Sequence, residues 1–176
     1  MAPQLIIFDV YGTLLKSDAS EDDFVVRAGF QELISAYPHA KKVAFSDANT
    51  RRVTRDLIQA GIYGAFSNVY DEHHCIREVA YSITDPRFRK LVMDMRGGEI
   101  KDLTTVCERE GVAKKDTVFI GDNFHGHERK AAQIHEVRYV QVPQFRNRVP
   151  IPDERDEHVQ YETPPKFTFT SLIGTL

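Results

Sequence analysis

The stretch that decides the fold is Gln4-Leu5-Ile6-Ile7-Phe8-Asp9-Val10-Tyr11-Gly12-Thr13-Leu14-Leu15, an apolar run that ends on a carboxylate and is soon followed by a glycine. Four apolar residues before an acid predict a buried parallel strand that brings Asp9 to the carboxyl edge of a sheet. Open α/β sheets bind their ligands at that edge. A carboxylate there, beside a glycine that lets the backbone turn tightly, can attack phosphorus or carbon, or bind a hard cation. Taken alone, the segment also fits a plain strand followed by a capped turn.

Two later apolar runs have a similar form. Lys42-Val43-Ala44-Phe45-Ser46 ends on a hydroxyl, and Val118-Phe119-Ile120-Gly121-Asp122-Asn123 ends on an acid. Further strands are expected at residues 65–70 and 138–142. Because helical patterns alternate with these runs, the sequence predicts right-handed βαβ units. The expected fold class is α/β: a three-layer, Rossmann-like sandwich around a central parallel five-stranded sheet.

Apolar residues at helical spacing predict helices at 24–37, 50–60, 101–110 and 127–135. Ser20 is a candidate N-cap for the first helix, which Pro38 ends, and Asn49 or Thr50 can cap the second. The third is expected to begin at Lys101.

These segments follow one another in the order of the four motifs of the haloacid dehalogenase-like (HAD) hydrolase superfamily. The chain resembles that family from about residue 4 to about residue 142. The resemblance implies that Asp9 is the nucleophile, Ser46 the phosphate-binding hydroxyl, Lys101 a charge-neutralising lysine and Asp122 a metal-binding acid. The phosphate of a phosphorylated substrate would then be bound by Gly12, Thr13, Ser46, Asp47 and Lys101.

The resemblance also implies a Mg²⁺ site. Asp9, Asp122 and the backbone carbonyl of Tyr11 would supply oxygen ligands of the kind that Mg²⁺ prefers. Without the resemblance, Asp122 also suits a helix N-cap, Ser46 a turn and Lys101 an exposed helix start.

Tyr11 departs from the family pattern. Family phosphatases usually read Asp-x-Asp-Gly-Thr, in which the second acid protonates the leaving group and later activates water, but this chain has Tyr11 in that place. A tyrosine there is similar to the dehalogenase branch, which uses the same aspartyl nucleophile on carbon. Dehalogenases carry a large helical cap between the first two motifs, and the segment from Asp9 to Ser46 is too short for one. We therefore expect a member without a large cap.

His127 stands about where family phosphatases place a second acid. It could ligate a softer divalent ion, such as Mn²⁺, directly, or Glu128 could swing in. The roles of His125 and His127 stay open. The segment 73–75, His-His-Cys, has no second pair of ligands at zinc spacing and is interpreted as ordinary surface or insertion residues.

Three functions remain. The leading hypothesis is an enzyme that hydrolyses phosphomonoesters through an aspartyl-phosphate on Asp9, slowly because Tyr11 replaces the usual acid. Its open site would admit bulky substrates. One alternative is a non-enzymatic HAD-like protein that binds a phosphorylated ligand or a protein partner. The other is a dehalogenase-type carbon hydrolase, which would need no metal.

Residues 1–176 are expected to form a single HAD-like domain with two additions. The segment 71–98 is longer than one helix and one strand require, and fits a reduced cap, a solvated helical excursion or an oligomer contact. Repeated prolines predict an irregular tail, 143–176, that wraps the domain and contains a short strand at 167–170. Arg146 and Arg148 in this tail could reach an anionic substrate or be solvated.

The composition narrows the partner classes. The 176-residue chain has 41% hydrophobic residues, 28% charged residues and a net charge of −3, which is typical of globular proteins and gives no indication of nucleic-acid binding. No apolar run approaches the roughly 20 residues that span a bilayer, so no membrane association is expected. Two cysteines and an N-terminus without signal-peptide features predict a reduced, cytoplasmic protein.

Overall fold

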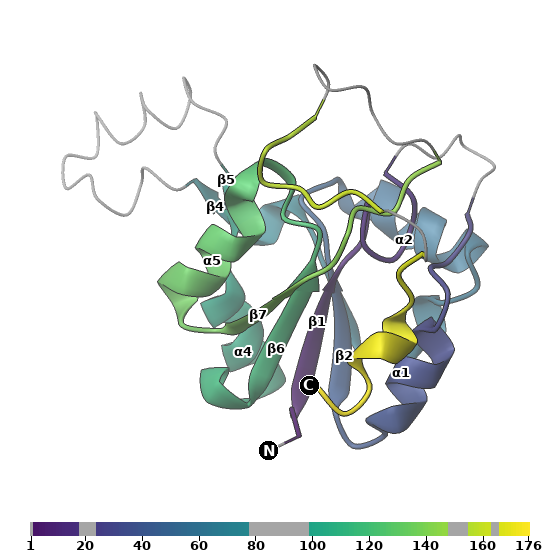
Figure 1. Cartoon of the computed structure of the whole chain (residues 1–176). Helices are drawn as coiled ribbons and strands as arrows, with labels where there is room; N and C mark the ends of the chain where they lie inside the picture. The colour runs from purple at the N-terminus through teal and green to yellow at the C-terminus, as the bar shows by residue number, and fades with distance from the viewer. Residues whose placement is uncertain (1, 18–23, 78–98, 148–154, 163–165) are drawn as a thin grey trace.

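A parallel sheet lies between two layers of helices in the computed structural model, which describes residues 2–17, 24–77, 99–147, 155–162 and 166–176 (Figure 1). The sheet has five strands in the order β3-β2-β1-β6-β7, and every neighbouring pair is parallel. The predicted α/β, Rossmann-like sandwich is confirmed. The strands of this sheet are β1 (Leu5–Asp9), β2 (Lys41–Phe45), β3 (Asn68–Tyr70), β6 (Thr117–Gly121) and β7 (Arg138–Gln141).

The two faces of the sheet follow from the alternation of side chains along each strand. Ile6 and Phe8 of β1 enter one hydrophobic core, and Leu5 and Ile7 enter the other. The first core is covered by α1 (Phe30–Ala36), α2 (Thr50–Gln59) and residues of the C-terminal tail. The second is covered by α4 (Leu103–Glu110) and α5 (His127–His135). Strand β1 is buried at every position because helices cover both of its faces.

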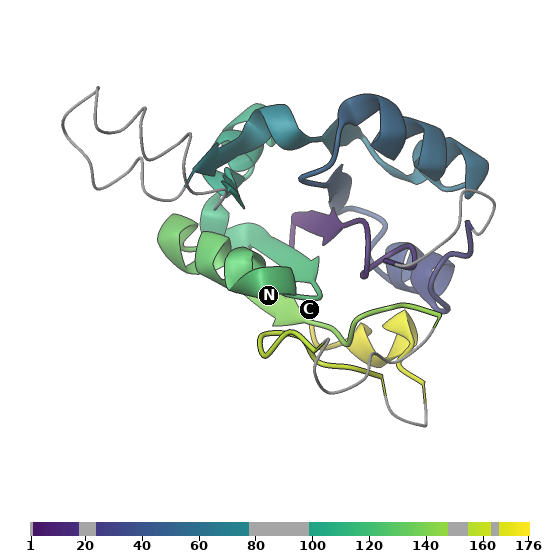
Figure 2. The same ribbon diagram turned by 90° about the horizontal axis from the view of Figure 1, so that it is seen from above.

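Strand β1 occupies the point where the strand order changes direction. The chain moves outward from β1 to β2 and β3 on one side, and places β6 and β7 on the other side. Figure 2, viewed from above, shows β1 between α2 (blue) and the C-terminal segments (yellow). Asp9 ends this central strand, so it lies where doubly wound sheets form their ligand crevices.

The first helix is shorter than predicted. It begins at Phe30 instead of Phe24, because Gly29 adopts a left-handed conformation with φ 82°. Residues 24–28 form no helix, and Val26 forms an antiparallel bridge with Leu15. Residues 18–23, including the candidate cap Ser20, lie outside the described part of the chain. The third strand is also shorter, since Tyr63–Ala65 form a 3₁₀ turn and pairing starts only at Asn68.

Lys101 does not begin a helix. It ends strand β5 (Glu99–Lys101), which pairs antiparallel with β4 (Cys75–Arg77). Helix α4 starts two residues later, because the side chain of Asp102 accepts a hydrogen bond from the Thr105 amide and caps it. The two short strands flank residues 78–98, the larger part of the expected insertion, which lie outside the described residues.

The C-terminal tail packs against the first core. The expected strand at 167–170 is wrong, because Phe169–Leu172 form a 3₁₀ helix (η7). Phe169 is fully buried, with its ring edge-on to that of Phe8 at a centroid distance of 6.0 Å. A Cβ atom at Gly29 would lie 2.6 Å from the backbone nitrogen of Thr170, so only glycine lets η7 approach α1 this closely.

A buried arginine joins this tail to the loop after β1. The Arg27 guanidinium donates to the carbonyls of Gly12, Thr13 and Pro143 at 3.1, 2.7 and 2.5 Å, and forms an ion pair with Glu162 at 3.1 Å. Burial lowers the pKa of Arg27 to about 10, so the group stays charged near neutral pH. Its planar head also lies over the rings of Phe145, Phe167 and Phe169.

Replacing Arg27 by Met should destabilise the protein strongly. The substitution leaves the three carbonyls without their donor and Glu162 without its partner, so the free energy of unfolding should fall by about 3 kcal/mol or more. Urea denaturation followed by circular dichroism measures the change. Arg51→Met, at an exposed position on α2, is the matched control and should change stability by less than about 0.5 kcal/mol. Equal stability of the two variants would contradict this role for Arg27.

Candidate active site

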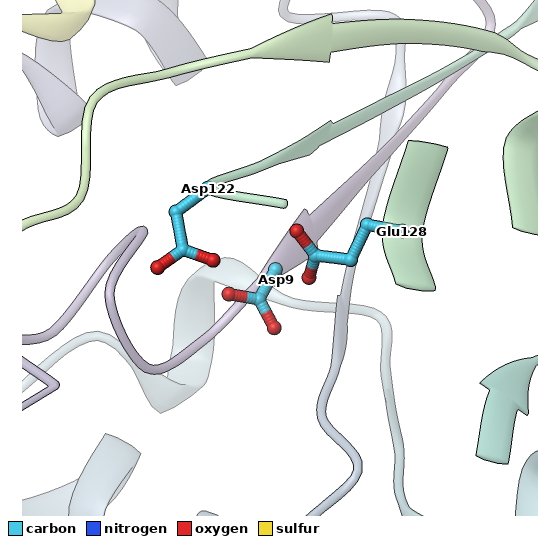
Figure 3. A group of neighbouring side chains, drawn as sticks. All are labelled: Asp9, Asp122 and Glu128. Atoms are coloured by element: carbon cyan, nitrogen blue, oxygen red, sulfur yellow. The ribbon is translucent and has the colours of Figure 1, made fainter. Parts of the chain in front are cut away.

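Three carboxylates meet at the carboxyl edge of the sheet. Asp9 ends β1, Asp122 follows β6 and Glu128 lies in the first turn of α5 (Figure 3). An oxygen atom from each lies within 4.8 Å of the other two, and all three side chains are buried. This geometry resembles the oxygen-ligand sets that bind divalent cations.

Lys101 is a buried cation that contacts this cluster. Its Nζ donates to Asp9 Oδ1 at 2.5 Å and to Glu128 Oε1 at 2.8 Å. Burial lowers the pKa of Lys101, but the two carboxylates outweigh that effect and the pKa lies well above its usual value. The amine is therefore charged and fixed beside Asp9.

One lysine does not neutralise three acids. Burial, followed by the charge of Glu128, raises the pKa of Asp9 to about 8 in spite of Lys101. Burial and the charge of Asp9 likewise raise the pKa of Asp122 to about 7. Asp9 Oδ2 is buried and has no hydrogen-bond partner among the described residues. The residues present therefore fit a divalent cation, which would supply the missing positive charge.

The loop after β6 fixes two of the carboxylates. Asn123 adopts a left-handed conformation with φ 65°, and its amide donates to Glu128 Oε2 at 2.5 Å. The Phe124 amide donates to Asp122 Oδ1 at 3.2 Å, and the Gln144 side chain donates to Asp122 Oδ2 at 3.0 Å. Because Gln144 belongs to the tail, the tail contributes directly to the site.

Glycines let the backbone approach these carboxylates. A Cβ atom at Gly12 would lie 2.1 Å from Asp122 Oδ2, and one at Gly121 would lie 2.4 Å from Glu128 Oε2. Gly12 also has a φ of 84°, which side-chain-bearing residues rarely adopt. Both positions therefore require glycine while the carboxylates keep their places.

Tyr11 lines the cleft, but its phenol is already bonded. Its hydroxyl donates to Asp56 Oδ2 of α2 at 2.7 Å, and the Arg52 guanidinium lies over its ring at 4.8 Å from the centroid. Burial and the bond to Asp56 raise the pKa of Tyr11 above its ordinary value. The phenol is therefore poorly suited to protonate a leaving group.

The other predicted residues lie near the cluster in different ways. Asp47 and His127 line a cleft of about 390 Å³ that includes the three carboxylates and Lys101. Ser46 is fully buried and does not line the cleft; its hydroxyl oxygen accepts a hydrogen bond from the Ala48 amide at 3.1 Å. Thr13 is also buried, and its hydroxyl has no partner among the described residues. The side chain of His125 lies outside the described part of the structure.

Several functional candidates are absent from the sequence predictions. Arg52, Gln144 and Asp56 carry no motif signal, and only their positions in space relate them to the site. Glu128 is the exception, because the sequence already offered it, beside His127, as a residue that could swing in. Glu128 supplies the third carboxylate of the cluster, while His127 lines the cleft. Arg146 lines the cleft, which agrees with one of the two alternatives that the sequence left open, and Arg148 lies outside the described residues.

No protein-family model and no curated protein matches this sequence. Solved structures do match. L-2-haloacid dehalogenase from Xanthobacter autotrophicus has a TM-score of 0.55 at 12% identity, over 84% of this chain and 80% of its own. A predicted phosphoglycolate phosphatase from Haemophilus somnus has a TM-score of 0.54 at 14% identity, over 85% and 90%. A HAD-superfamily hydrolase of subfamily IA from Geobacter sulfurreducens has a TM-score of 0.52 at 14% identity, over 82% and 91%.

These likenesses show the fold of the chain. They confirm the fold implied by the four sequence segments, and they include a dehalogenase and a predicted phosphatase. Among the described residues, no helix combines the length and hydrophobicity needed to cross a membrane.

Replacing Gly121 by Ala should weaken cation binding without unfolding the protein. The added methyl group would displace the Glu128 carboxylate, which is held by Lys101 and the Asn123 amide. We expect the affinity for Mg²⁺ or Mn²⁺, measured by calorimetry, to fall about tenfold or more. Gly64→Ala is the matched control, since a Cβ atom there meets nothing within 4 Å. Unchanged affinity in a folded Gly121→Ala variant would show that Glu128 does not contribute to a cation site.

Proposed function

We propose that this chain, which has the fold of the haloacid dehalogenase-like hydrolases, is a divalent-cation-dependent phosphohydrolase that uses Asp9 as its nucleophile. The observation that carries the proposal is the buried Asp9 carboxylate, with one oxygen on Lys101 and the other without a partner among the described residues. Both neighbouring acids, Asp122 and Glu128, are placed to share a cation with it. A carbon-directed hydrolase would have no use for such a ligand set.

Asp9 would attack the phosphorus atom of a bound phosphate ester. A new bond forms between a carboxylate oxygen and phosphorus, the bond from phosphorus to the ester oxygen breaks, and its electron pair leaves with that oxygen. Water then hydrolyses the aspartyl-phosphate to inorganic phosphate and restores Asp9. Lys101 offsets the negative charge on the nucleophile and the transferred group throughout.

Mg²⁺ is the cation that the oxygen-rich ligand set suits best. Asp9, Asp122 and Glu128 would hold it, together with the backbone carbonyl of Tyr11. When bound, the cation neutralises the repulsion between a carboxylate nucleophile and a phosphate dianion. Mn²⁺ would be preferred if His127, at the wall of the cleft, also acted as a ligand.

The leaving group receives little help from Tyr11. Its phenol donates to Asp56 and has a raised pKa, so it replaces the usual acid poorly. A missing general acid typically lowers the rate by about 10²- to 10⁴-fold. We therefore propose slow turnover that favours esters with good leaving groups.

An oligomer contact through 71–98 falls mainly on residues outside the described part of the chain and stays a prediction.

Asp9→Asn should abolish phosphatase activity. Hydrolysis of p-nitrophenyl phosphate with Mg²⁺ or Mn²⁺ should fall at least about 10³-fold, because the amide cannot act as the nucleophile. Asp116→Asn, just before β6 at the opposite edge of the sheet, is the control and should retain wild-type activity. Equal rates for wild type and Asp9→Asn would contradict the proposed function.

Tyr11→Asp tests whether the missing acid limits turnover. A carboxyl group at this position should raise the rate of hydrolysis of β-glycerol phosphate, whose alcohol is a poor leaving group, about tenfold or more. The rate for p-nitrophenyl phosphate should rise much less. Tyr11→Phe removes only the hydroxyl and should leave the β-glycerol phosphate rate unreduced, because the phenol is bonded to Asp56. If Tyr11→Asp changes neither substrate while fold and cation binding persist, a binding function or carbon-directed chemistry would be favoured instead.

A further inference from the structure

An arginine-lined hollow adjoins the Asp9 cleft. It has a volume of about 490 Å³ and is lined by the first turns of α2, through Asn49, Arg51, Arg52 and Arg55. Arg52 lines both this hollow and the cleft that contains Asp9. The two spaces are therefore neighbours, and Arg52 stands at their junction. We call Arg51 and Arg52 the α2 arginines.

Arg52 is held in place by Tyr11 and Asp56. Its guanidinium lies over the Tyr11 ring, and its Nε is 3.7 Å from Asp56 Oδ2, the atom that also accepts the Tyr11 hydroxyl. Its side chain is nonetheless 60% exposed, so most of its donors can reach a ligand. The residue that replaces the usual acid thus supports a cation at the cleft wall.

Among the described residues, Arg51 and Arg52 bring positive charge to the hollow that Asp56 balances only in part. Asp56 accepts from Arg55 at 2.8 Å and faces Arg52, so it is shared between them. Arg51 is exposed, and its side chain makes no hydrogen bond or ion pair within the described residues. A planar guanidinium presents paired donors that match phosphate oxygens. The hollow therefore suits an anion.

We propose that the substrate is a phosphoanhydride whose leaving group is itself a phosphate, bound by the α2 arginines. This inference rests on the proposed function, since it names the substrate class of the same site. Asp9 forms a bond to the terminal phosphorus atom, the bond from that atom to the bridging oxygen breaks, and the electron pair stays on the departing phosphate. Hydrolysis of the aspartyl-phosphate by water then releases the terminal group as inorganic phosphate.

The chemistry of the leaving group agrees with the residues around it. A phosphate leaves as an anion and needs no proton, so a site whose Tyr11 hydroxyl is bonded to Asp56 can still release it. The negative charge that develops on the bridging oxygen would be stabilised by the Arg52 guanidinium. An alkyl ester has neither a leaving group that is stable as an anion nor a second phosphate for the arginines to bind.

Calorimetry tests the anion site without turnover. In the presence of Mg²⁺, methylenediphosphonate should bind about tenfold or more tightly than methylphosphonate, and Arg52→Gln and Arg51→Gln should each remove most of that difference. Lys115→Gln, an exposed cation just before β6, is the matched control and should keep it. Equal affinities for the two phosphonates in the wild type, or a difference that Arg52→Gln leaves intact, would overturn the inference.

Kinetics separates this inference from the proposed function. The ratio of kcat/KM for pyrophosphate or ADP to that for p-nitrophenyl phosphate should fall about tenfold in Arg52→Gln and Arg51→Gln. Arg52→Lys should restore only part of the loss, because an ammonium group lacks the paired donors. Asp9-dependent hydrolysis of p-nitrophenyl phosphate with an unchanged ratio would overturn the inference alone. Loss of Asp9 dependence would overturn the proposed function, while the calorimetric result would still decide the anion site.

Discussion

The burial of three carboxylates beside a single lysine is the constraint on which the rest of this structure depends. Charged groups taken out of water cost several kcal/mol each unless other charges and hydrogen bonds compensate. Lys101 offsets part of the charge of Asp9 and Glu128, while the Asn123 amide donates to Glu128 and the Phe124 amide donates to Asp122. What remains is a net negative site that a divalent cation would complete. A fold arranged for stability alone would have no reason to gather these groups.

The C-terminal tail supplies further contacts that hold this site together. Arg27 binds the loop after β1 to the tail, and Gln144 of that tail binds Asp122. The loop after Asp9, the Asp122 side chain and the tail are thereby connected through buried polar contacts, and removing one partner would weaken the others. The aromatic rings that surround Arg27 exclude water from these contacts and strengthen them. The tail is in this sense part of the site.

The sequence predicted the elements whose signal is local. The two buried parallel strands that lead to Asp9 and Asp122 are visible in the sequence as apolar runs. Helix α5 is visible there through the helical spacing of its apolar residues. The predicted start of α1 was wrong because the apolar residues at 24–26 have a spacing that also fits a helix. The left-handed conformation of Gly29 and the bridge between Val26 and Leu15 instead set the backbone conformation there. Strand β5 was missed because its partner β4 lies beyond a long segment, and the roles of Arg27 and Gln144 arise only from tertiary contacts.

Tyr11 shows how one substitution can reorganise a site without emptying it. An aspartate at this position would have a shorter side chain than tyrosine and would leave Asp56 without the hydrogen bond from the phenol. The phenol instead donates to Asp56, while its ring offers a face to Arg52. The exchange therefore trades a proton donor for a fixed positive charge at the cleft wall. Since a cation stabilises an anionic leaving group as a proton stabilises an alkoxide, the proposed hydrolysis would depend more on the leaving group that the substrate carries than on a general acid.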